Sequence, residues 1–199
     1  MNKYITKYNI KWFIESIKSG ANFRYETFWE NCEDVKNNFF SQWFDSNFTI
    51  NGRVYNTCEK YMMSEKAILF RDFDSYVKIM DEKSPEICKK YGREVKNFDA
   101  AIWDTAFREI IFTANVAKFT KNEELKNRLL STADAVLIEA SPYDDICGAG
   151  IIATDLIDEN GKLKVAPQNW HKKDSSRQAE NNLGFVLMGV RDYIREVYE

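Results

Sequence analysis

Apolar and polar positions alternate most clearly over residues 39–55, which are rich in aromatic and β-branched side chains. Asn51–Gly52 divides this stretch into two halves, Phe-Thr-Ile before it and Arg-Val-Tyr after it. An Asn-Gly pair between two such halves is typical of a two-residue β-hairpin. We therefore predict a pair of short strands here.

A helical pattern follows from residue 56 to about residue 135. Asn56 is expected to cap the first helix, so that Glu59 stands at its third position. A further helix is expected to begin at Ser84 and Pro85 and to end near Gly92.

The longest helical stretch spans residues 99–122. Apolar residues recur along it at the spacing of one helical face, which predicts a buried stripe. The stripe consists of Ile102, Ala106, Ile110 and Ala114.

The two ends of the chain add a few strands and one more helix. Residues 1–20 predict a short strand and then a helix, and residues 135–140 predict a buried strand. A second hairpin-like excursion is expected at 156–164, and an amphipathic helix at 181–199. The expected fold is a mostly helical α+β domain over residues 21–199, preceded by an N-terminal extension over residues 1–20.

Composition narrows the class of protein. The chain has 199 residues, of which 44% are hydrophobic and 15% aromatic, enough for one domain with a substantial core. Its net charge of −3 is not that of a protein held on nucleic acid by bulk charge, although a local basic patch is compatible with it.

The cysteines and the histidine give no metal-ligand spacing. There are four cysteines, without a C-x-x-C pair, and one histidine, His171, to which we assign no role. This pattern indicates reduced thiols in a cytoplasmic protein, without metal or cofactor. We also expect neither a secretory signal nor a transmembrane helix.

Two charged side chains in the first long helix are candidates for a site. Seven residues separate Glu59 from Lys66, so both fall on one helical face, two turns apart. Together they can line a pocket. Spacing alone favours the other interpretation by about two to one, in which both charges are solvated, because charged residues on helices usually are.

The loop at 141–150 is the second candidate. It follows a predicted buried strand and contains two adjacent aspartates and the glycines Gly148 and Gly150. Glycines let a ligand approach the backbone closely, but an ordinary turn has the same composition. The loop matches neither a P-loop nor a dinucleotide-binding motif.

Aromatic and basic residues complete the set. Trp43, Trp103 and Phe119 can stack on a base, although such residues more often belong to the core. Arg108 and Lys118 are ten residues apart, close to three helical turns, so they can hold a phosphate or can both be exposed.

Several motifs occur in the order seen in the NADAR (YbiA-like) family, and the resemblance runs from about Phe28 to Tyr193. The most specific are E-x-Y-M-M-x-x-K-A at 59–67, K-F-x-x-N at 118–122, and S-P-x-D at 141–144 before G-x-G at 148–150. The chain has Cys147 where the family signature has Trp.

The resemblance implies an N-glycosidase that acts on the bond between C1 of a phosphorylated ribose and an exocyclic amine. Its implied substrates are riboflavin-pathway ribosylamino-pyrimidines or, alternatively, ADP-ribosylated guanine in DNA. A non-catalytic module that binds ADP-ribose is an alternative of another class. The oligomeric state is not specified.

The resemblance also assigns roles to residues. The implied catalytic residues are Glu59, Lys66 and Asp144. The implied substrate-binding residues are Trp43, Trp103, Arg108, Lys118, Asn122, Gly148 and Gly150. We expect Glu59, Lys66, Trp103 and Asp144 to line one pocket.

Two mechanisms fit these residue types. In the first, Lys66 attacks C1 of the opened ribose to form a Schiff base, while Glu59 transfers protons. In the second, Glu59 and Asp144 act as acid and base around an oxocarbenium-like state, and Lys66 holds phosphate.

Overall fold

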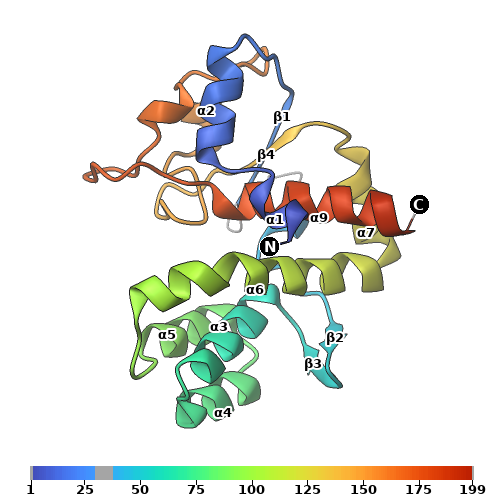
Figure 1. Ribbon diagram of the computed structural model, residues 1–199, viewed down its shortest axis with the longest axis vertical. Helices are drawn as coiled ribbons and strands as arrows, with labels where there is room; N and C mark the ends of the chain where they lie inside the picture. The colour runs from blue at the N-terminus through green and yellow to red at the C-terminus, as the bar shows by residue number, and fades with distance from the viewer. Residues whose placement is uncertain (1, 30–37, 199) are drawn as a thin grey trace. The chain divides into compact units, whose positions relative to one another are not determined.

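The computed structural model describes residues 2–29 and 38–198, and its helices outnumber its short strands (Figure 1). The fold is α+β and mostly helical, as predicted. Contacts within the chain define two compact units, which are described separately. The terminal unit comprises Met1–Ser41 and Asn127–Glu199, and the central unit is Gln42–Lys126.

The terminal unit is built on a two-stranded parallel sheet. Strand β1 (Tyr25–Phe28) pairs with β4 (Val136–Glu139), with Tyr25 opposite Val136 and Phe28 opposite Glu139. The C-terminal helix α9 (Asn182–Tyr198) packs on β4, and the short helix α1 (Lys3–Thr6) packs on α9. The remaining elements are α2 (Ile10–Lys18), η1 (Asn38–Phe40), α8 (Ala153–Leu156) and η2 (Pro167–Asn169).

Residues 1–20 differ from the prediction. Residues 3–6 form a helical turn rather than a strand, because Asn2 accepts a hydrogen bond from the backbone N–H of Tyr4 and starts a helix. Helix α2 follows, and its Phe13 is completely buried with its ring 5.5 Å from that of Trp170 and 6.0 Å from that of Phe185. The N-terminal helices thus share the core of the terminal unit, while the domain boundary at residue 20 stays a prediction.

The central unit begins with the predicted hairpin. Strands β2 (Phe48–Ile50) and β3 (Arg53–Tyr55) are antiparallel, and Asn51 and Gly52 turn between them at φ angles of 50° and 76°. Two successive positive φ values are those of a type I′ turn, which Asn-Gly adopts readily. The prediction for this segment is confirmed.

Four helices complete the central unit: α3 (Cys58–Leu69), α4 (Phe73–Asp81), α5 (Pro85–Arg93) and α6 (Ala100–Lys121). Helix α3 packs against the other three, and α3, α4 and α5 lie on one side of α6 (Figure 1). Helix α7 (Glu123–Ser131) spans the boundary between the units.

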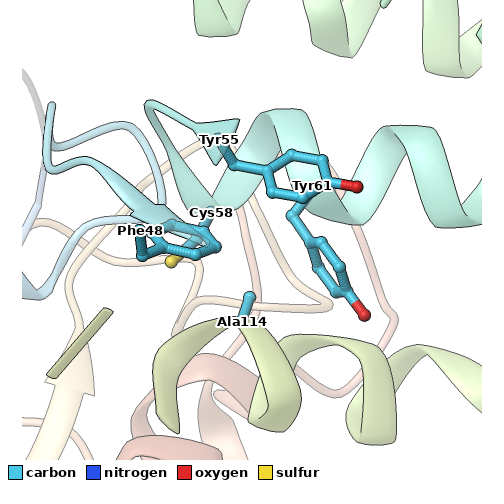
Figure 2. Close-up of a cluster of buried hydrophobic side chains, with 5 residues drawn as sticks. All are labelled: Phe48, Tyr55, Cys58, Tyr61 and Ala114. Atoms are coloured by element: carbon cyan, nitrogen blue, oxygen red, sulfur yellow. The ribbon is translucent and has the colours of Figure 1, made fainter. Parts of the chain in front are cut away.

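A buried cluster joins the hairpin, α3 and α6 (Figure 2). The rings of Tyr55 and Tyr61 meet edge to face at 5.0 Å between centroids, and Phe48 stacks on Tyr55 at 5.9 Å. Cys58 and Ala114 are small enough to let α3 and α6 approach beside these rings. The cluster therefore fixes the N-terminal end of α3.

Two details of the helices correct the sequence predictions. Thr57 rather than Asn56 caps α3, since its hydroxyl accepts the N–H of Lys60 at 3.2 Å, so Glu59 stands at the second helical position. The stripe predicted on α6 is confirmed only in its second half. Ala114 is buried and Ile110 packs against the cluster with α3 and the hairpin, whereas Ile102, near the start of the helix, is 48% exposed.

No helix within residues 2–29 and 38–198 is long and apolar enough to cross a lipid bilayer.

We predict that Gly184→Ala, in α9, destabilises the protein. A Cβ atom there would collide with the carbonyl oxygen of Leu137 in β4 and with the Asn181 side chain. Helix propensity alone would make the change stabilising by up to about 1 kcal/mol, whereas overpacking costs about 1–3 kcal/mol. Denaturant titration should show a lower free energy of unfolding. Val197→Ala, at an exposed position of α9, is the control, and a stabilised Gly184→Ala protein would contradict this packing.

Candidate active site

Lys66 lies half-buried on α3 with a defined set of contacts. Its Nζ donates a hydrogen bond to the carbonyl oxygen of Gly92 at 2.8 Å. The same Nζ is 4.2 Å from the ring centroid of Phe98 and 5.5 Å from that of Trp103. The amine is therefore fixed by one carbonyl and two aromatic faces.

This environment lowers the pKa of Lys66. Burial is the largest cause, and the positive charge of Arg93 adds to it, while the carboxylate of Glu59 acts in the opposite direction. A lower pKa increases the fraction of neutral amine near pH 7, and only the neutral amine is a nucleophile.

Gly92 can offer its carbonyl to Lys66 because it has no side chain. A Cβ atom at this position would collide with the side chain of Met63, which packs against the glycine. Met63 and Lys66 both belong to α3, so the close approach of α5 to α3 brings the Gly92 carbonyl within reach of the amine.

Glu59 is buried at the start of α3, with 2% of its surface exposed. Its backbone N–H donates to the carbonyl oxygen of Gln42 at 3.0 Å. A carboxylate in the first helical turn interacts favourably with the helix dipole. The interpretation of Glu59 as a solvated charge, which spacing alone favoured, is wrong.

Lys118 is completely buried in α6. Its Nζ is 5.3 Å from the ring centroids of both Phe44 and Phe119. Burial lowers the pKa of Lys118 to about 8, against a smaller opposite effect of the Cys58 thiol. This lysine is shielded from bulk water, and two aromatic rings lie beside its amine.

The spacing of Arg108 and Lys118 left two roles open, a phosphate site or two exposed side chains, and the structure excludes exposure of both. Ten residues turn an ideal helix by about 1000°, about 80° short of three turns. Arg108 is accordingly half-buried, whereas Lys118 is fully enclosed. Asn122, at the end of the same helix, donates its side-chain amide to the carbonyl oxygen of Lys118 at 2.6 Å, so it caps α6.

The aromatic candidates divide into core and partly exposed residues. Phe119 is completely buried and belongs to the core. Trp43 and Trp103 are half-buried, and the Lys89 ammonium lies 5.7 Å from the Trp43 ring. Only the two tryptophans of this set keep ring surface for a ligand.

The loop at 141–150 follows β4 in the terminal unit, as predicted. Oδ1 of Asp144 accepts the backbone N–H groups of Ile146 and Cys147, both at 2.8 Å. The N–H of Gly150 donates to the carbonyl oxygen of Asp144 at 3.1 Å. This aspartate therefore orders its own loop.

Gly148 and Gly150 have conformational reasons to be glycine. Gly150 has a φ of 70°, and a Cβ there would collide with the backbone at His171 and Lys172. A Cβ on Gly148 would approach the carbonyl oxygens of Asp144 and Glu139 at 2.9 and 3.0 Å. Close backbone approach within the chain accounts for both glycines.

The structure thus brings Lys66 and Trp103 together in the central unit, and the charge of Glu59, on the same helix as Lys66, acts on the Lys66 amine. Arg108, Lys118, Asn122 and Trp43 belong to the same unit. Asp144, Gly148 and Gly150 belong to the terminal unit, and their place in a common pocket with Glu59 stays a prediction.

Sequence reasoning missed three residues beside this group: Gly92, Phe98 and Gln42. Gly92 had been interpreted only as a helix end, and Phe98 lies outside every predicted stripe. Phe98 keeps 46% of its surface exposed although it lies next to the Lys66 amine. An isolated Phe between two helices was the only available signal.

Another missed pair lies in the terminal unit. The ring of Trp29, which follows β1, is 5.8 Å from the ring of Tyr143, in the loop after β4. The carboxyl ends of parallel strands meet at one edge of a sheet, which explains why these aromatic side chains meet. Tyr143 is 79% exposed.

Comparison with known proteins identifies the family. A sequence model of the NADAR domain matches residues 27–195. The chain belongs to the NADAR family. Residues 1–26, which include α1 and α2, lie outside the matched part.

Relatives of this NADAR protein include named enzymes. N-glycosidase R617 of Acanthamoeba polyphaga mimivirus is 38% identical over 77% of this chain and 85% of its own length. N-glycosidase YbiA of Escherichia coli (strain K12) is 27% identical over 81% of this chain and 90% of its own length. These names support a hydrolase of the N-glycosidase class.

The solved structure of the E. coli protein YbiA has the same fold as this NADAR protein. The NMR structure superimposes with a TM-score of 0.62 at 23% identity, over 86% of this chain and 87% of that one.

We predict that Arg93→Gln raises the pKa of Lys66, because it removes a positive charge that lowers it. The titration of Lys66, followed by NMR of isotope-labelled lysine side chains, should move to higher pH. Arg93→Lys keeps the charge and should leave the titration close to that of the unaltered protein. An unchanged Lys66 titration in Arg93→Gln would show that the charge of Arg93 does not contribute to the lowered pKa.

Lys118 should make stability depend on pH. Its pKa falls from 10.5 in the unfolded chain to about 8 on folding, equivalent to about 3 kcal/mol. The unfolded chain binds more protons between these pH values, so the free energy of unfolding rises from pH 8 to 10.5. This contribution is lost as the pH falls through 8. In denaturant titrations, Lys118→Met should remove most of this rise in the free energy of unfolding with pH. Lys121→Met, at an exposed position, should leave the rise unchanged. If the free energy of unfolding of Lys118→Met depends on pH as that of the unaltered protein does, the pKa of Lys118 is not lowered by folding.

Proposed function

We propose that the protein is an N-glycosidase that cleaves the bond between C1 of a phosphorylated ribose and an exocyclic amine. Ribosylamino-pyrimidine phosphates are the proposed substrates. The observation that carries the proposal is the half-buried Lys66, whose pKa is lowered and whose amine is held at Gly92, Phe98 and Trp103. The names of the related N-glycosidases support the bond class.

The proposed reaction begins with opening of the ribose ring. The lone pair of the glycosylamine nitrogen forms a C=N bond to C1, the C1–O4 bond breaks, and O4 takes up a proton. The neutral Lys66 amine then adds to C1. Transfer of a proton from Nζ to the original amine lets that amine leave, which gives a Schiff base between C1 and Lys66.

Water completes the cycle. It adds to C1 of the Schiff base, the C1–Nζ bond breaks, and the free sugar closes its ring again. Each half of the reaction moves a proton to or from an atom attached to C1. Glu59 is the proposed carrier, because it stands on the same helix and its charge acts on Lys66.

Asp144 is the proposed acid–base partner of Glu59 only in the two-carboxylate mechanism. Its Oδ1 already accepts two backbone N–H groups, which supports a role in ordering the loop. We therefore favour the Schiff-base route.

Removal of ADP-ribose from guanine in DNA is the second proposed reaction, because it breaks the same kind of bond. The net charge of −3 provides no bulk attraction for DNA, so we rank it second. One relative, the chloroplastic riboflavin biosynthesis protein PYRR of Zea mays, is 34% identical over 49% of this chain and 17% of its own length, and its name supports a substrate from riboflavin biosynthesis.

The test is borohydride trapping during turnover, with a ribosylamino-pyrimidine phosphate in one reaction and ADP-ribosylated guanine DNA in another. Borohydride reduces a Schiff base to a stable secondary amine, so intact-mass analysis should show a sugar-phosphate adduct on the peptide that carries Lys66. Lys66→Arg should abolish both turnover and the adduct. Glu59→Gln should lower turnover by about 100- to 10,000-fold.

The other possible outcomes separate the alternative mechanism from a non-catalytic binding module. Turnover without an adduct, together with near-normal turnover of Lys66→Arg, would reject the Schiff base and leave the two-carboxylate route, with Asp144→Asn as the next variant. Binding of the sugar phosphate without turnover of either substrate would indicate a binding module.

A further inference from the structure

Gln42 carries a buried hydrogen-bond donor that no residue within 2–29 and 38–198 accepts. The residue is 5% exposed, and its Nε2 atom has no hydrogen-bond acceptor among the described residues. A buried N–H group without an acceptor costs about 1–3 kcal/mol, so a folded protein normally pairs it.

The orientation of this amide follows from its neighbours. Asn115, which is completely buried in α6, donates its Nδ2 to the carbonyl oxygen of Ile111 at 2.8 Å and to Oε1 of Gln42 at 3.0 Å. Oδ1 of Asn115 accepts the Cys58 thiol at 3.8 Å. The Ile111 carbonyl can only accept, so it determines which end of the Asn115 amide is nitrogen, and this in turn orients Gln42. Oε1 of Gln42 is thereby occupied, and Nε2 is the end that remains.

Gln42 also lies beside Glu59, the proposed proton carrier. Its backbone carbonyl accepts the N–H of Glu59 at 3.0 Å, and both residues belong to the central unit. A hydrogen-bond donor held next to Glu59 is suited to pair with an oxygen of the substrate on which Glu59 is proposed to act. Hydroxyl and phosphate oxygens are the acceptors that a sugar phosphate offers.

We propose that Gln42 is a substrate-contact residue whose Nε2 donates to an oxygen of the sugar-phosphate part of the substrate. Asn115 is then the positioning residue that keeps the donor end of the amide toward the ligand. This inference rests on the proposed function for the identity of the ligand, but its test does not require catalysis.

The test measures binding of ribose 5-phosphate by calorimetry. Gln42→Glu keeps the shape and an oxygen for Asn115 but replaces the Nε2 donor by oxygen, and it should weaken binding about tenfold or more. Gln168→Glu makes the same change at an exposed glutamine and controls for the added charge. Unchanged affinity in a folded Gln42→Glu protein, or no binding by the unaltered protein, would overturn the inference.

A second measurement avoids substitution of the tested protein. The side-chain amide signal of Gln42, assigned by its absence from the NMR spectrum of Gln42→Met, should shift on addition of ribose 5-phosphate and should not shift with the free aminopyrimidine. If the Gln42 amide signal does not shift on addition of the sugar phosphate, the Nε2 donor is paired with water alone, and the inference is overturned.

Kinetics separate this contact from a structural role. Loss of a ground-state contact raises KM more than it lowers kcat, whereas general loosening of the fold lowers the thermal midpoint and affects both constants. If the unaltered protein binds ribose 5-phosphate but turns over neither substrate, the proposed function fails, and calorimetry still decides the role of Gln42.

Discussion

The cost of removing charged groups from water governs the arrangement around α3. The first two turns of this helix are buried almost all round, and they contain Glu59 and Lys60. Charges in such a position must be compensated by the helix dipole, by nearby carbonyls or by opposite charges. Helices α4, α5 and α6 all pack against α3, and α5 supplies one compensating carbonyl, that of Gly92, to the Lys66 amine.

Gly92, near the end of α5, affects both the packing of two helices and the position of the Lys66 amine. Because Gly92 has no side chain, Met63 fills the space beside it and the two helices approach closely. The same approach supplies the carbonyl that holds the Lys66 amine. Both the packing of α5 on α3 and the proposed chemistry of Lys66 therefore depend on the absence of a side chain at Gly92.

Local chemistry explains what the sequence could predict. The Asn51–Gly52 turn, the Ser84–Pro85 start of α5 and the buried strand before the 141–150 loop each depend on a few adjacent residues, and all three are confirmed. The cap at Thr57 and the exposure of Ile102 in α6 were missed, since both depend on which neighbours pack against a helix. Asn56 has an equally suitable side chain for a cap, but its amide donates to the Lys83 carbonyl instead.

The candidate site shows the same division. The family resemblance supplied Glu59 and Lys66, whereas spacing alone favoured solvated charges at both positions. Gln42, Phe98 and Gly92 reach the site only through tertiary contacts, so no local motif marks them. The amide of Gln42 in particular becomes notable only when the Asn115 and Ile111 contacts are known.

The half-buried position of Lys66 has a consequence for chemical probes. Lys118 is completely enclosed, so its amine offers no approach to a reagent dissolved in water. Lys66 combines a lowered pKa with remaining exposure and a neighbouring aromatic face at Phe98. Aryl aldehydes and aryl sulfonyl fluorides need this combination of a neutral amine, an open path and a surface for ring stacking. We therefore expect covalent ligands directed at lysine to react at Lys66 before Lys118.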